Sequence, residues 1–274
     1  MNALLEHPAI QAGVAPFIAA LLASLAFGRA RIAWIGIVVG YLIAILLTTG
    51  LAFVPLTVSR KVLLLMLLTP VIGLAADRWR LVSARAPVLM AVLAAAVTPW
   101  VLASVLAQKE GITQMVLPGV AIAAFAAAVV ALTLRLRDDG IATAAAGIGL
   151  GAGVGVAALL SASTGYFTSG IALAAASGAL MLGQFAAGRV VPACALGGLP
   201  IGLGAALFCA AALMLAQLPW YALPATLLVP IVAGLPIAAS GSVRLRAALL
   251  TLMCLAASAV PIFAAWYATQ GAAS

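Results

Sequence analysis

The 49 residues from Gly140 to Gly188 contain no charged side chain, and this feature constrains the fold more than any other. The centre of the stretch, Gly147 to Ala157, has the sequence GIGLGAGVGVA. A bilayer core about 30 Å thick is crossed by about 20 apolar residues in a helix. The stretch therefore predicts two helices inside a membrane, packed closely through their small residues.

Composition extends this prediction to the whole chain. Of the 274 residues, 67% are hydrophobic and 7% are charged, against roughly 45–50% and about 25% in soluble domains. A water-soluble fold cannot hide so much apolar surface. We expect an all-α, polytopic integral membrane protein with a single membrane domain over residues 1–274. The net charge of +8 is explained by basic residues beside the spans and by membrane lipids as partners, with no nucleic acid.

Charges, glycine and proline clusters and amide residues divide the chain into about ten candidate spans. One boundary depends on the uncharged polar turn SASTGYFTSG, residues 161–170. If that turn lies inside the membrane, the count is nine. The ten spans are residues 8–27, 32–54, 61–76, 86–107, 113–134, 141–161, 167–187, 190–216, 220–240 and 247–269.

The basic residues predict the orientation of these spans. Ten arginines lie in odd-numbered loops, and only three basic residues lie in even-numbered loops. The positive-inside rule places the odd loops in the cytoplasm and both termini on the outer or periplasmic side. The arginines are Arg29, Arg31, Arg78, Arg80, Arg85, Arg135, Arg137, Arg189, Arg244 and Arg246, and the even-loop residues are Arg60, Lys61 and Lys109.

Aromatic residues and overall composition agree with a multi-pass cell-membrane location. Most tryptophans and several tyrosines fall near predicted span ends, as interfacial belts require. The alanine-rich, lysine-poor composition favours a bacterial cytoplasmic (inner) membrane. The aromatic residues are Trp34, Trp79, Trp100, Trp220, Tyr221, Trp266 and Tyr267.

The spans divide evenly into halves, residues 1–139 and 140–274. Because five is an odd number of spans, two copies of a duplicated five-span unit would insert into the membrane in opposite orientations. The even division therefore predicts a 5+5 inverted repeat. In size and span count the chain is similar to the drug/metabolite transporter superfamily, but it carries no motif of that family and its termini are predicted on the opposite side. At the boundary, RLRDDG predicts a helix end closed by Gly140, with Arg135 paired to Asp138 or Asp139.

The sequence offers little for catalysis or for a cofactor. It contains no HExxH, GxSxG or CxxC motif, and its one histidine, His7, precedes the first span. Ser177 lies in AASG but has no interior histidine to activate it. Cys194, Cys209 and Cys254 fall in apolar spans and are expected to pack as small hydrophobic side chains. We expect no enzyme activity, no cofactor and no metal site.

Glycine spacing is the most specific signal in the chain. Gly147, Gly151 and Gly155 form one row on the sixth span, and Gly149 and Gly153 form a second row beside it. Residues four apart share a helix face, so these rows predict close packing against other helices. The alternative is a softened, sliding helix, because each glycine costs about 1 kcal/mol relative to alanine.

Prolines near mid-span are the second signal. Each removes a backbone donor and frees a carbonyl one turn earlier, which must find a partner in lipid. The adjacent threonine hydroxyls can serve, which predicts simple kinks. Alternatively, the freed carbonyls line a pathway between spans three, four, eight and nine, which two further polar residues, Gln184 and Tyr166, would face. The pathway candidates are Thr69, Pro70, Thr98, Pro99, Gln184, Pro200 and Pro230.

Two functions are compatible with these features. Kinked spans, a glycine-rich helix and the absence of acids within the spans favour a carrier or facilitator for a small neutral, amphipathic or lipid-like solute. The alternative is a non-catalytic accessory or assembly subunit of a larger membrane complex, whose small-residue faces dock onto other membrane subunits.

Overall fold

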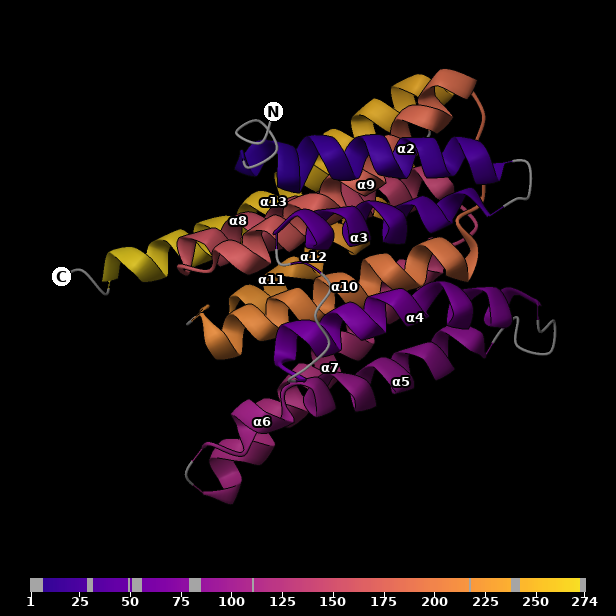
Figure 1. Cartoon of the computed structure of the whole chain (residues 1–274). Helices are drawn as coiled ribbons and strands as arrows, with labels where there is room; N and C mark the ends of the chain where they lie inside the picture. The colour runs from indigo at the N-terminus through magenta and orange to yellow at the C-terminus, as the bar shows by residue number, and fades with distance from the viewer. Residues whose placement is uncertain are drawn as a thin grey trace.

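The computed structural model describes residues 7–28, 32–48, 50, 56–78, 85–109, 111–216, 218–237 and 242–271. These residues form helices joined by short connections, without strands (Figure 1). The helices are η1 (Ile10–Val14), α2 (Ala15–Phe27), η3 (Ala33–Ile35), α3 (Gly36–Thr48), α4 (Val58–Arg78), α5 (Ala86–Val101), α6 (Ala103–Leu106), α7 (Ile112–Arg135), α8 (Gly140–Leu160), α9 (Thr164–Ala187), α10 (Cys194–Leu215), α11 (Ala222–Thr226), α12 (Leu228–Ala233) and α13 (Val243–Gly271).

Seven of the described helical stretches are long and apolar enough to cross a bilayer, as expected of a multi-pass membrane protein. Three shorter apolar stretches coincide with the second, fourth and ninth predicted spans. The seven are Ile10–Phe27, Val58–Arg78, Ile112–Arg135, Gly140–Leu160, Thr164–Ala187, Cys194–Leu215 and Val243–Gln270, and the three are Ala33–Thr48, Pro87–Val101 and Ala222–Ala233.

The boundaries differ from the predicted ones for identifiable reasons. The third span is longer than predicted, because α4 begins at Val58 and ends at Arg78. The fourth is interrupted at Leu102, three residues after Pro99, and the ninth at Leu227. The polar turn is a reversal at residues 161–163 that separates α8 from α9.

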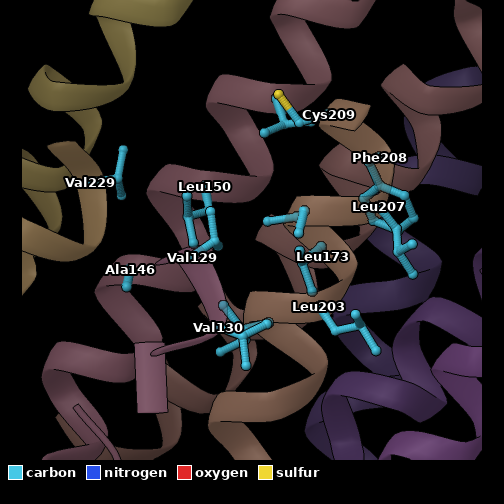
Figure 2. Packing of buried hydrophobic residues seen from close by; sticks show 14 of the residues in the cluster. Val129, Val130, Ala146, Leu150, Leu173, Leu203, Leu207, Phe208, Cys209 and Val229 are labelled. Atoms are coloured by element: carbon cyan, nitrogen blue, oxygen red, sulfur yellow. The ribbon is translucent and has the colours of Figure 1, made fainter. Parts of the chain in front are cut away.

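Helices α8 and α10 form the centre of the bundle and are buried over most of their length. Helix α10 packs against α4, α7, α8 and α9, and α8 packs against α9 and α13. Figure 2 shows buried side chains of this core, among them Val129 of α7, Leu150 of α8 and Leu203 of α10. Helix α2, by contrast, packs on α3 and α9 and exposes Leu22 and Leu25 on its other side.

The helix pairs bear on the predicted 5+5 repeat. A 5+5 repeat would make α3 equivalent to α9 and α4 equivalent to α10. Both of these helix pairs are in contact across the halves. The large contact of α8 with α13 has no comparable counterpart between α2 and α7. The second half therefore supplies most of the centre, and the repeat stays a prediction.

The two ends of the bundle differ in charge. At one end, which we name the Arg-rich end, helix termini and connections carry Arg78, Arg85, Arg135, Arg137, Arg189, Arg244 and Arg246. The opposite, Arg-poor end carries Arg60, Lys61 and Lys109 among the described residues. In Figure 1, α2 begins and α13 ends at the Arg-poor end, at the left. Four of the residues cited in the orientation and belt predictions, Arg29, Arg31, Arg80 and Trp79, lie outside the described residues.

Most of the described belt aromatics are exposed near helix ends, but Trp34 is an exception. Its side chain is only 2% exposed, so its assignment to an interfacial belt is wrong. A Cβ on Gly197 would stand 2.5 Å from the Trp34 ring, and one on Gly140 would stand 2.9 Å from it. The two glycines let the indole pack inside the bundle at the Arg-rich end.

The RLRDDG segment is also arranged differently from the prediction. Helix α7 ends at Arg135, and Gly140 opens α8 instead of closing α7. Asp139 caps α8 by accepting from the amides of Ile141 and Ala142 at 3.1 and 3.2 Å. Its carboxylate pairs with Arg246 on α13 rather than with Arg135. An acidic cap satisfies free amides and complements the helix dipole.

Candidate functional site

Pro70 and Thr69 form a self-contained kink inside α4. The Thr69 hydroxyl donates to the Met66 carbonyl at 2.7 Å, and both Thr69 and Pro70 are buried. Met66 is the residue whose carbonyl Pro70 leaves without its usual amide donor. At this position the threonine therefore completes the backbone hydrogen bonding, as a structural kink requires.

Thr98 and Pro99 do not repeat this arrangement. The Thr98 hydroxyl donates to Ala94 at 2.8 Å, whereas Pro99 frees the carbonyl of Ala95. Pro99 borders an apolar surface groove with Ala103 and Gly119. The same motif thus has different hydrogen bonding in the two spans.

The other pathway candidates lie in separate places. Pro200 is buried within α10, and Pro230 lies in the first turn of α12, where a missing amide donor costs little. Gln184 accepts from the Val191 amide at 3.0 Å near the Arg-rich end of α9. Its Nε2 is buried and has no hydrogen-bond partner among the described residues.

The two glycine rows face two different helices. In the first row, a Cβ on Gly151 would lie 2.5 Å from the Ala174 amide nitrogen and 2.6 Å from the Gly170 carbonyl of α9. In the second row, a Cβ on Gly149 would lie 2.8 Å from the Cys254 carbonyl of α13. Helix α8 is therefore wedged between α9 and α13 at backbone contact distance.

A polar cavity of about 560 Å³ lies between the two halves of the chain, at the Arg-poor end. Its walls come from the end of α3, the start of α4, the start of α9 and the middle of α10. The lining residues are Tyr41, Ile45, Thr48, Gly50, Thr57, Ser59, Arg60, Val62, Leu63, Ser163, Thr164, Gly165, Tyr166, Thr168, Ser169 and Phe208.

The floor of the cavity combines an aromatic pair with a hydroxyl chain. Tyr41 is 1% exposed, and its ring lies 5.5 Å from that of Phe208 on α10. The Tyr41 and Ser169 side chains share a hydrogen bond. The Ser169 hydroxyl also donates to the Gly165 carbonyl at 3.0 Å. The floor can therefore accept hydrogen bonds at hydroxyl oxygens while presenting an apolar ring.

The mouth of the cavity joins the two halves through side chains. Tyr166 on α9 hydrogen-bonds Ser59 on α4, and Arg60 is the charged residue of the described lining. The neighbouring Lys61 points elsewhere, because its ammonium lies 5.0 Å from the Trp100 ring centre on α5. Hydroxyl groups thus dominate the mouth, and the described lining contains no carboxylate.

At the Arg-rich end, polar contacts join helices that are distant in the sequence. Asp77 at the end of α4 accepts from the amides of Ala195 and Leu196 at 2.9 and 3.1 Å. A carboxylate from one half thereby caps the first turn of α10 in the other half. Together with the pair of Asp139 and Arg246, this contact ties four helices together at that end.

Of the polar residues predicted to face a cavity, Tyr166 does line this one, and Gln184 lies near the other end of α9. The candidate prolines and their threonines are not among its lining residues. Tyr41, Thr168 and Ser169 line the cavity but were not predicted from the sequence. The usable signal was the hydroxyl density of the turn at residues 161–170, which resembles an ordinary connection until its neighbours are known.

The chain gives no significant match to any protein-family model, and no curated protein sequence matches it either.

Proposed function

We propose that this protein is a membrane carrier or facilitator for a small neutral, amphipathic solute that binds in the polar cavity between the halves. The cavity itself is the observation that carries the proposal. Its volume of about 560 Å³ lies within the roughly 300–1,000 Å³ of small-molecule sites. It joins hydroxyl donors and acceptors to the apolar surfaces of Ile45, Leu63 and Phe208.

The difference between the two ends supports a transport role. The cavity lies at the Arg-poor end, whereas Asp77 and Asp139 hold neighbouring helices together at the Arg-rich end. An alternating-access carrier has such an arrangement when it is open to one side only. With ten spans in a 5+5 arrangement and the Arg-rich end in the cytoplasm of a bacterial cell, this state faces outward.

Polar groups continue along α9 below the cavity floor. Ser169, Ser177 and Gln184 fall on one buried side of the helix, from the cavity floor towards the Arg-rich end. Ser177 Oγ and Gln184 Nε2 are buried without hydrogen-bond partners among the described residues. Both side chains face α8, because a Cβ on Gly147 would meet the Ser177 hydroxyl and a Cβ on Gly140 would lie 2.7 Å from Gln184 Oε1.

The accessory-subunit hypothesis depends on free small-residue faces. The glycine rows of α8 are occupied by α9 and α13 of the same chain. This occupancy favours the carrier hypothesis over the subunit hypothesis, and neither invokes an enzyme activity.

Solute flux tests the proposal. Proteoliposomes would be challenged with glycerol, erythritol or methyl glucoside while stopped-flow light scattering follows their swelling. We expect at least one solute to enter several-fold faster than it enters protein-free liposomes of the same lipid. If the protein is monodisperse and correctly inserted, entry rates equal to those of protein-free liposomes for every neutral solute tested would contradict the proposal.

A further inference from the structure

We propose that a second, apolar groove on the lipid-facing side of the bundle is a binding site for one anionic phospholipid. This inference is independent of the carrier function. The groove has a volume of about 610 Å³ and lies between α7, the end of α10 and α11. Its α7 wall is lined by Leu117, Ala121, Ala124 and Ala128.

The length of the groove matches one leaflet. From Leu117 to Ala128 the α7 wall spans about 16 Å at the rise of an α-helix, which is close to half of a hydrocarbon core about 30 Å thick. The small side chains of Ala121 and Ala124 leave a channel along this wall, and both residues are exposed. The groove therefore has the dimensions of an acyl chain that runs from the membrane surface to the midplane.

One end of the groove has residue types that are typical of the level of the lipid head groups. Lys109 and Trp220 both line it there, and Trp220 is 72% exposed. Tryptophan concentrates at membrane interfaces, and a lysine beside a membrane surface attracts anionic lipid. Positive charge above an apolar channel fits the phosphate of a phospholipid whose acyl chain fills that channel.

Native mass spectrometry of the purified full chain tests this site. After delipidation, the protein would be titrated with phosphatidylglycerol and phosphatidylcholine of identical acyl chains. We expect one lipid per chain to be retained, with phosphatidylglycerol preferred by about fivefold, which corresponds to about 1 kcal/mol for one lysine. Lys109→Gln is expected to remove the preference, and Ala124→Phe to remove retention of both lipids.

Two matched controls separate the site from general effects. Lys61→Gln removes a basic residue at the same end of the bundle, and Ala96→Phe enlarges an exposed alanine of α5. Both controls are expected to retain lipid as the unmodified protein does. Equal retention of the two lipids by the unmodified protein would overturn the proposal, as would unchanged retention in Ala124→Phe. Retention of oleate without phosphatidylglycerol would also overturn it, because the occupant would then be a fatty acid.

Discussion

Replacing Gly151 with leucine is expected to abolish the folded protein. A Cβ at this position would already lie 2.5 Å from the Ala174 amide nitrogen and 2.6 Å from the Gly170 carbonyl. These are backbone atoms of α9, which cannot rotate away as a side chain can. Overpacking in a core costs about 1–3 kcal/mol when side chains can shift, and here two helices must separate. We expect loss of the monodisperse size-exclusion peak, or a fall in Tm of roughly 10 °C or more.

The matched control is Gly183→Leu on α9. A Cβ on Gly183 meets no atom within 4 Å, so the same substitution there introduces no contact and improves helix propensity. We expect its elution profile and Tm to stay close to those of the unmodified protein. If Gly151→Leu behaves like Gly183→Leu, the close packing of α8 on α9 does not exist as described.

Thr168→Trp is expected to reduce solute flux by tenfold or more. Thr168 lines the polar cavity from the first turns of α9 and is partly exposed. An indole at this position would occupy space above Tyr41 and Ser169 without entering the packed core. Flux is measured in the proteoliposome assay, with Gly183→Trp as the control because position 183 faces open space. Unchanged flux in a correctly folded Thr168→Trp protein would place the route elsewhere.

Much of the fold could be predicted from the sequence because bilayer physics acts on single helices. A span needs a run of apolar residues whatever its neighbours are, so seven of the predicted stretches coincide with described helices long enough to cross a bilayer. The glycine spacing on α8 likewise acts locally, since residues four apart share a face. Which helix each glycine row faces depends on the packing of the whole chain.

The polar cavity could not be predicted for the same reason. Its floor joins Tyr41, Ser169 and Phe208, which lie on three helices from both halves. Tyr41 in the sequence is one aromatic residue within an apolar span, and nothing local marks it as part of a site. The prolines offered a stronger local signal, but at Pro70 the Thr69 hydroxyl satisfies the freed carbonyl, as the simple-kink prediction expected, so this signal does not mark the cavity.

Contacts between residues far apart in the chain could not be predicted from the sequence either. Asp77 caps α10 across more than one hundred residues of chain, and Trp34 packs inward because two glycines make room for it. Both contacts lie at the Arg-rich end, where interfacial exposure was the simpler expectation. Both contacts hold helices together at this end of the bundle.

The central claim is that the polar cavity opens to the outer side of the membrane while the Arg-rich end is closed and cytoplasmic. Labelling with a membrane-impermeant maleimide tests it most directly. The native Cys194 is exposed at the Arg-rich end, and Thr168→Cys in a Cys194→Ser background places a thiol in the cavity. The account predicts that Thr168→Cys reacts in right-side-out vesicles and that Cys194 of the unmodified chain reacts only in inside-out vesicles. Reaction of Thr168→Cys only in inside-out vesicles, or in neither, would contradict it.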